Sequence, residues 1–377
     1  MLVIKIAGES ALFKSLSVFF TAFPEIGASL DLSSRLLQST SGWSEVSGWT
    51  DTQLSDSGRF LFGAPLVTKV SRFQIPKSGI YFVSFSVHLS QADIGLFQAA
   101  LVINGQTDQR NEAMSAVRQG YQGGDFSLVV SGFVDLRSSD EISVFAFSEK
   151  DTDWSVEDDS QFTLRYTGPV GSFPAFSAVK STAMTTGSPS SSHVIRNWDT
   201  SGTPGTFVSL TGFSPSTGEF VAICDGIYFL AANILVRANR GLQKLYLTVN
   251  GEIRGPFVDV KTASSEGVFT MNLHGSLYLK TGDKLSLLIN SSSSAGVAIH
   301  SDSGFSVSYI DAFNQSSLQG VSTLTQTTTE IPGTGWMELT TWPTPLIAHV
   351  QFYNPEVFHH GRFTCSQGGI YYVAVSI

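Results

Sequence analysis

The stretch FQIPKSGIYFVSFSV, residues 73–87, decides the fold class because two similar stretches follow it in the chain. FVAICDGIYFLAANI occupies residues 220–234, and FTCSQGGIYYVAVSI occupies residues 363–377. Self-similarity at a long, fixed period is the signature of a repeat architecture, so we expect a tandem array of one folding unit. The three copies share a glycine at separations of 147 and 143 residues, at Gly79, Gly226 and Gly369.

Further markers recur in the same order at nearly the same spacing. The Asn-Gly pairs that begin at Asn104 and Asn250 lie 146 residues apart, and the closing aromatic segments around Tyr166 and Tyr309 lie 143 apart. One more period back from Tyr166 reaches Phe20 in the segment LSVFFTA. We therefore predict two complete repeats between two partial ones, and expect the chain to be a piece of a longer protein.

These repeats divide the chain into predicted domains. Residues 39–168 and 193–313 are each expected to form a complete domain, whereas residues 1–23 supply the closing strands of one truncated repeat and residues 330–377 the opening part of another. The segment 167–192 is rich in Ser, Thr, Gly and Pro, which predicts a flexible spacer.

Apolar residues within a unit alternate along the sequence. Tyr81, Val83 and Phe85 face one way, with Phe82 and Ser84 opposite, which is the period of a half-buried strand. The Asn-Gly pairs predict type I′ hairpin turns. No stretch indicates a capped helix, and about eight to ten short strands per ~145 residues are typical of sandwiches. We predict an all-β fold of tandem antiparallel jelly-roll β-sandwiches.

Composition excludes several classes of protein. Charged residues make up 14% of the chain and hydrophobic residues 42%, which excludes a disordered chain and a coiled coil. A net charge of −9 argues against nucleic-acid binding, and two cysteines cannot build a disulfide framework. Because Lys5, Glu9 and Lys14 interrupt the apolar N-terminal segment, we predict neither a signal peptide nor a membrane span there.

The order of these motifs resembles the C1q-type globular head, which shares a ten-strand jelly roll with the tumour necrosis factor ligands. The similar features are the glycine before an aromatic strand, the Asn-Gly hairpin, a Gly-Asp before an apolar strand and a closing aromatic strand. Cys365, four residues before Gly369, matches a frequent F-x-C of that family, whereas Cys224 lies two residues before Gly226. No collagen-like Gly-X-Y tract is present in the sequence.

An acidic run, EKDTDWSVEDD at residues 149–159, is the candidate metal site. Calcium binds six to eight oxygen ligands from such loops, and the resembled family sometimes binds calcium. The run lacks a spaced D-x-D-x-D-G pattern, so a solvated loop is the favoured interpretation. The candidate calcium ligands are its acidic residues Asp151, Asp153, Glu157, Asp158 and Asp159.

Other candidate residues have plainer interpretations. Asn290 and Asn314 begin N-glycosylation sequons in predicted loops. Tyr81 and Tyr228 are expected to be buried strand aromatics rather than a ligand platform. Cys224 and Cys365 occupy near-equivalent places in different units and are expected to be free thiols, and His359–His360 is an isolated pair.

The sequence contains no G-x-S-x-G, P-loop, H-E-x-x-H or C-x-x-C motif, so we predict that the protein is not an enzyme. The leading hypothesis is an extracellular binding, adhesion or innate-recognition protein that binds protein or glycan ligands. As the resemblance implies, its heads would pack as trimers, either a homotrimer or an intramolecular pseudo-trimer. The alternatives are a secreted cytokine similar to tumour necrosis factor and a carbohydrate-binding module of a secreted enzyme.

Overall fold

A computed structural model of the chain describes most of two large segments and short strands near both ends. The described residues are 2–3, 5–7, 12–13, 16–23, 27–32, 36–38, 41–50, 71–92, 95–105, 111–120, 124–151, 153–186, 191–210, 212–239, 241–263, 267–293, 296–311, 320–324, 329–330, 336–338, 358–359, 362–363 and 370–376. They form strands that pair antiparallel and contain no helix. Within them, no helix has the length and apolarity that a membrane crossing requires.

The first sandwich is built from two sheets of four main strands. One sheet, called the inner sheet because it packs against the second sandwich, has the order β5 (Gly27–Leu32), β16 (Gln161–Gly168), β10 (Gly79–Ala92) and β13 (Gly124–Leu136). Its outer sheet has the order β7 (Gly42–Glu45), β14 (Glu141–Ser148), β11 (Gly95–Ile103) and β12 (Asn111–Gly120). When the eight main strands are numbered in chain order, the inner sheet has the order one-eight-three-six and the outer sheet the order two-seven-four-five. This is the strand order of a jelly roll.

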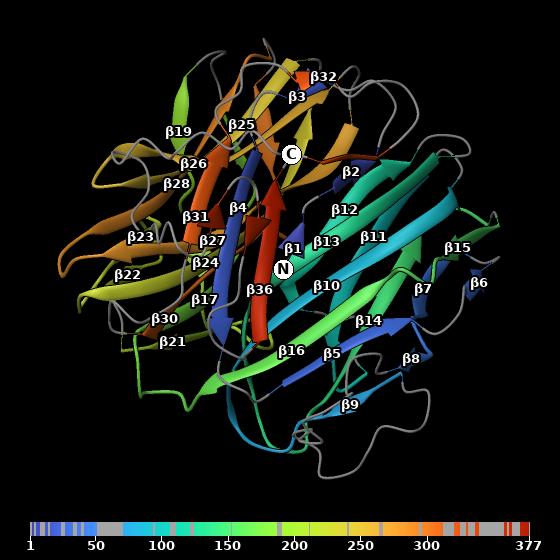
Figure 1. The fold of residues 1–377 in the computed structure, drawn as a ribbon, viewed down its shortest axis with the longest axis horizontal. Coiled ribbons are helices and arrows are strands. Elements are labelled where there is room, and N and C mark those ends of the chain that lie inside the picture. The colour runs from blue at the N-terminus through green and yellow to red at the C-terminus, as the bar shows by residue number, and fades with distance from the viewer. Residues whose placement is uncertain are drawn as a thin grey trace.

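The second sandwich repeats this order. Its inner sheet consists of β17 (Ala175–Lys180), β30 (Gly304–Asp311), β24 (Gly226–Ala238) and β27 (Gly267–Leu279). Its outer sheet consists of β19 (Ser192–Val194), β28 (Lys284–Ser291), β25 (Gly241–Val249) and β26 (Glu252–Ala263). The predicted fold class, all-β with antiparallel jelly-roll sandwiches, is therefore confirmed (Figure 1).

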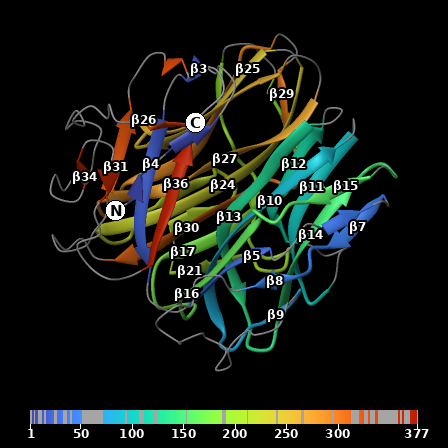
Figure 2. The same cartoon turned by 45° about the vertical axis from the view of Figure 1, so that its right-hand side comes forward.

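Strands from the two ends of the sequence pair with each other. β4 (Leu16–Phe23) lies between β31 (Gly320–Leu324) and β36 (Ile370–Ser376), as Figures 1 and 2 show. This order, one-eight-three, is the order of the inner sheets above. Tyr371 pairs with Ala22, whereas the sequence spacing aligned Phe20 with the closing tyrosines, so the observed register differs by two residues.

The predicted alternation of β10 is confirmed. Tyr81, Val83 and Phe85 are at most 1% exposed and lie in the core between the two sheets of the first sandwich. Tyr228 is likewise fully buried in the second core, so both tyrosines are structural aromatics. The Tyr81 hydroxyl donates to the Lys77 carbonyl at 2.7 Å, and burial raises the pKa of Tyr81 to about 12.

The Asn-Gly turns have the predicted backbone conformation. Asn104 and Gly105 have φ values of 56° and 68°, and Asn250 and Gly251 have 55° and 84°. Positive φ at both central residues is what a type I′ turn requires, and asparagine and glycine tolerate it best. The Asn104 side-chain oxygen also accepts a hydrogen bond from the Glu141 N–H at 2.9 Å. Asn104 therefore stabilises the turn through both its backbone conformation and its side chain.

Several strands, including β5 and β17, lie outside the predicted domain boundaries. β5 precedes residue 39, and β17 lies within the segment 167–192 that was predicted to be a spacer. All six residues of β17 are buried, and the strand pairs with β30. The spacer interpretation is therefore wrong for residues 175–180, because Ser-rich composition concealed a short strand. The division of the chain into four domains stays a prediction.

Candidate functional site

The acidic run connects β14 to β16 at one end of the first sandwich. It contains β15 (Trp154–Val156), which pairs with β10 and with β6 (Leu36–Gln38). Trp154 is only 1% exposed and belongs to the core. Burial of this indole fixes the loop against the sandwich, so the carboxylates on either side of it have defined positions.

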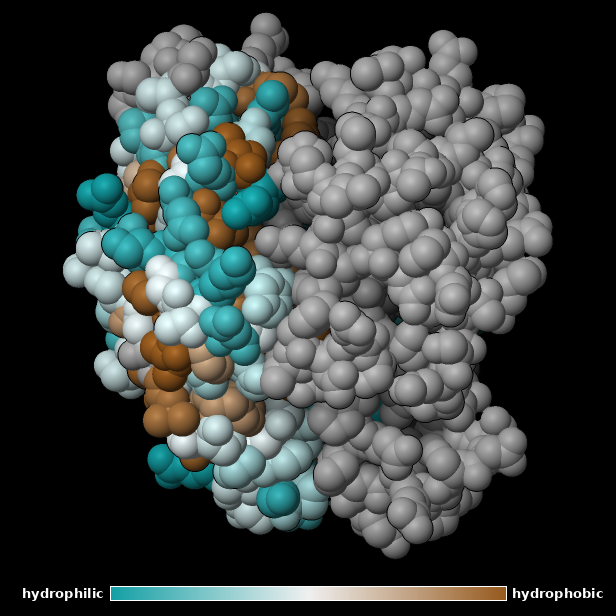
Figure 3. Space-filling model, turned by 60° about the vertical axis from the view of Figure 1, so that its left-hand side comes forward, coloured by the Kyte–Doolittle hydropathy of each residue, from teal (hydrophilic) through white to brown (hydrophobic). Residues whose placement is uncertain are grey.

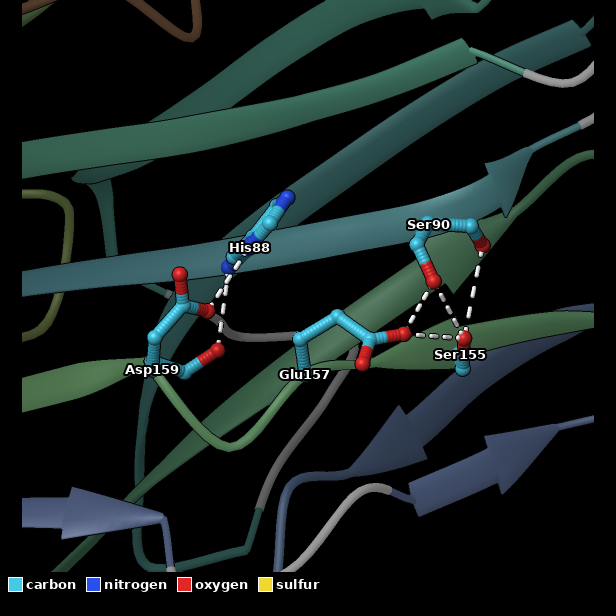
Figure 4. A network of polar contacts seen from close by, with 6 residues as sticks. His88, Ser90, Ser155, Glu157 and Asp159 are labelled. Carbon is cyan, nitrogen blue, oxygen red and sulfur yellow. Dashed lines mark hydrogen bonds and ion pairs between the residues drawn. The ribbon is translucent and has the colours of Figure 1, made fainter. Parts of the chain in front are cut away.

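Glu157 is held by two serine hydroxyls from neighbouring strands (Figure 4). The Ser155 hydroxyl donates to the Glu157 carboxylate at 2.7 Å, and the Ser90 hydroxyl donates to the same oxygen. The two serine oxygens lie 2.7 Å apart, and both residues are buried. Hydrogen bonds to a charged acceptor are stronger than neutral ones, so this trio ties β15 to β10.

His88 engages a different carboxylate in the same network. Its Nδ1 lies 2.7 Å from Asp159 Oδ1, and its backbone N–H donates to the Ser160 hydroxyl at 3.0 Å (Figure 4). Activation of a serine nucleophile requires its hydroxyl to donate to a base such as imidazole. Here the hydroxyls of Ser90 and Ser155 donate to the Glu157 carboxylate and not to an imidazole, so the trio anchors the loop.

The five candidate calcium ligands are dispersed. Asp151 accepts the Ser41 N–H at 2.5 Å, and this backbone hydrogen bond lowers the pKa of Asp151. Asp153 and Asp158 are exposed, while Glu157 and Asp159 belong to the network above. Across the described part of the chain, no three His, Cys, Asp or Glu side chains gather as a metal site. The calcium site stays a prediction that this geometry does not support.

The remaining candidates have mixed outcomes. Asn290 lies on β28 rather than in a loop, and its side-chain amide donates to the Ser192 hydroxyl at 3.3 Å, so its predicted placement is wrong. Cys224 is a free thiol whose sulfur lies 3.3 Å from the Tyr228 hydroxyl. Three candidates lie outside the residues whose side chains are described: Asn314, Cys365 and the pair His359–His360.

A cluster of phenylalanine rings joins the two sandwiches. Phe82 lies 5.4 Å from Phe133 in its own sandwich and 5.1 Å from Phe229 in the second, and Phe133 lies 5.9 Å from Phe229. All three are fully buried, as is Ile80, and Phe207 at 5% exposure belongs to the same cluster. The alternation placed Phe82 opposite the core correctly, but it gave no sign that a second sandwich covers that face.

Polar side chains of the second sandwich bind the exposed backbone edge of β13. The Asn233 amide donates to the Ser131 carbonyl at 2.8 Å and accepts the Ser131 N–H at 3.4 Å. The Ser306 hydroxyl accepts the Phe133 N–H at 3.1 Å. An edge strand exposes unpaired N–H and C=O groups, and these side chains satisfy them. The edge of β13 thus meets the face of the second sandwich edge to face, and β12 also pairs with β27 at Arg118 and Phe269.

Comparison with known proteins yields similarity at the level of structure alone. No protein-family model matches the sequence, and no curated protein matches it. Eiger TNF from S. frugiperda is 16% identical with a TM-score of 0.31, over 39% of this chain and 95% of that chain. Murine APRIL, in a crystal structure at pH 5.0, is 13% identical with a TM-score of 0.29, over 36% of this chain and 98% of that chain. At this level neither similarity assigns a function.

Proposed function

We propose that this chain is an extracellular, non-enzymatic recognition or adhesion protein whose C1q-like sandwiches bind protein or glycan ligands. The observation that carries the proposal is the edge-to-face contact between the sandwiches. Because this contact covers the inner sheets around Phe82 and Phe229, the outward faces of the outer sheets and the end loops are the surfaces open to a partner. The polar network at the loop end ties β15 to β10, since the hydroxyls of Ser90 and Ser155 donate to the Glu157 carboxylate.

The outer surface of the second sandwich is suited to binding rather than to burial. Figure 3 shows hydrophilic side chains over this face, with apolar side chains between them. The partly exposed apolar residues include Ile253 and Val260 on β26, at 51% and 38% exposure. Surfaces that bind partners commonly combine apolar contacts with a polar surround.

We further propose that the heads pack within one chain as a pseudo-trimer. The contact between the two sandwiches supports this, as does the third strand group with the order β31–β4–β36. Light scattering tests the arrangement. A mass near the 40.6 kDa of one chain is expected, and a mass near three times that value would show that heads of different chains associate instead.

Saturable binding of the labelled chain to intact, non-permeabilised cells tests the recognition function. We expect saturable binding that excess unlabelled chain displaces. Treatment of the cells with trypsin or with glycosidases before binding then distinguishes a protein ligand from a glycan. The proposed function would be contradicted if the chain showed no saturable binding to a panel of cell types and no binding on glycan and protein arrays.

A further inference from the structure

The outer sheet of the first sandwich presents two aromatic rings to the surface. Trp43 on β7 is the cross-strand partner of Phe147 on β14, and Phe147 is the partner of Gln98 on β11. The neighbours of Phe147 along its strand, such as Ala146, are buried in the core, so the row formed by Trp43, Phe147 and Gln98 faces outward. These strands lie on the right in Figure 1, away from the second sandwich.

The two rings form a partly open platform. Their centroids are 5.2 Å apart with the planes tilted by 45°, and both residues are only partly buried. An aromatic face carries negative charge density and attracts the polarised C–H groups of a molecule stacked on it. A pyranose ring has such a C–H face, with hydroxyl groups around its rim. The platform therefore offers the apolar half of a sugar-binding site.

The polar half lies on the same face. Gln98, beside Phe147, carries both an amide donor and a carbonyl acceptor. Glu45 follows Trp43 by two residues, and its carboxylate accepts the Arg72 Nε–H at 2.8 Å. Arg72 also lies 3.7 Å from Glu141 and is about half exposed at its side chain. Amide, carboxylate and guanidinium groups together can donate to and accept from sugar hydroxyls.

The second sandwich shows that the fold does not require this aromatic pair. In both sandwiches a tryptophan indole donates to the carbonyl three residues earlier, Trp49 to Val46 and Trp198 to Ile195. The residue six positions before each tryptophan pairs with the outer sheet: Trp43 pairs with Phe147, and Ser192 pairs with Asn290. Two polar residues thus replace the two rings at the equivalent place, and the sheet forms equally well.

We propose that this outer face, built on Trp43 and Phe147, is a binding site for a pyranose unit of a glycan. The sugar ring stacks on the aromatic pair, and Gln98, Glu45 and Arg72 bind its hydroxyls. The inference rests on the proposed recognition function and narrows it to one ligand class and one face. A cross-strand aromatic pair can also serve only to stabilise a sheet, and the experiment separates that role from ligand binding.

The test is a glycan array probed with the intact chain and with the double variant Trp43→Ser/Phe147→Asn, which carries the residues of the second sandwich. We expect at least one class of pyranose glycan to bind the unchanged chain and to lose tenfold or more in affinity with the double variant. Gln98→Ala, which keeps both rings, is expected to weaken the binding of the same glycan. The matched control Ser192→Ala, on the second sandwich, is expected to leave binding unchanged.

Urea denaturation of each variant identifies loss of folding as a separate effect. Glycan binding that is unaffected by the double substitution would overturn the inference, as would a double variant that loses stability while binding every glycan normally. Either of these results would reject the sugar site without rejecting the proposed function. Cell binding that resists glycosidases and is unchanged by the double substitution would reject the sugar site and keep the recognition role, whereas the absence of saturable cell binding by the unchanged chain would reject both.

Discussion

Replacing Phe229 by alanine is expected to weaken the coupling between the two sandwiches. The side chain is fully buried and lies 5.1 Å from Phe82 and 5.9 Å from Phe133. Truncation of a buried phenylalanine to alanine costs about 3–5 kcal/mol, of which each ring pair contributes about 0.5–1.5 kcal/mol. Because Phe229 lies outside the core of its own sandwich, we expect that core to remain intact. Calorimetry should then resolve two transitions where the unchanged chain shows one.

A double-mutant cycle tests whether the loss belongs to the contact. Phe82→Ala and Phe229→Ala remove rings that touch, so their combined effect should be smaller than the sum by about 1 kcal/mol. Ile253→Ala is the matched control, because this apolar residue is 51% exposed on β26 and surface truncations stay within about 0.5 kcal/mol. A loss below 1 kcal/mol for Phe229→Ala, or strict additivity in the cycle, would refute the reasoning.

Three further predictions concern polar residues. Asn233→Ala removes both hydrogen bonds to the Ser131 backbone and is expected to lower the free energy of unfolding, measured by urea denaturation, by about 2 kcal/mol. An unchanged free energy of unfolding would contradict the edge-to-face contact. Lys180→Met is expected to raise stability by about 1 kcal/mol, because burial lowers the pKa of Lys180 and its ammonium donates to two uncharged carbonyl oxygens, those of Thr182 and Asn197. A clear loss of stability would show that these hydrogen bonds dominate. Burial lowers the pKa of His274 to about 4, so stability present above pH 6.5 should decline by at most about 3 kcal/mol as pH falls through 4, and His274→Gln should flatten that slope.

The strand pattern was predictable because it depends on local chemistry. The alternation around Tyr81 reflects a strand with one face in a core, and the Asn104 turn reflects a backbone conformation that few residues tolerate. Both signals lie within a few residues of sequence. Tyr228 and Asn250, which follow Tyr81 and Asn104 by 147 and 146 residues, are likewise a buried strand aromatic and a turn residue with positive φ.

The surroundings of these strands were not predictable because they depend on distant contacts. Phe82 faces away from its own core, and only the second sandwich decides whether that face is covered. The partners of Glu157 and Asp159 lie 67 and 71 residues away, on β10. An acidic run by itself is compatible with a metal site, whereas Ser90 and His88 from β10 show that its carboxylates have other partners.

At the loop end of the first sandwich, some side chains of the polar network lie at positions where the fold does not require a particular residue. In both sandwiches the backbone N–H at the same place donates to a serine hydroxyl, His88 to Ser160 at 3.0 Å and Leu235 to Ser303 at 2.9 Å. The bond is the same although the side chain changes from imidazole to an apolar group, so the fold constrains the serine and not the histidine. Outward positions that differ in this way are the ones able to give two sandwiches of identical strand order different ligands.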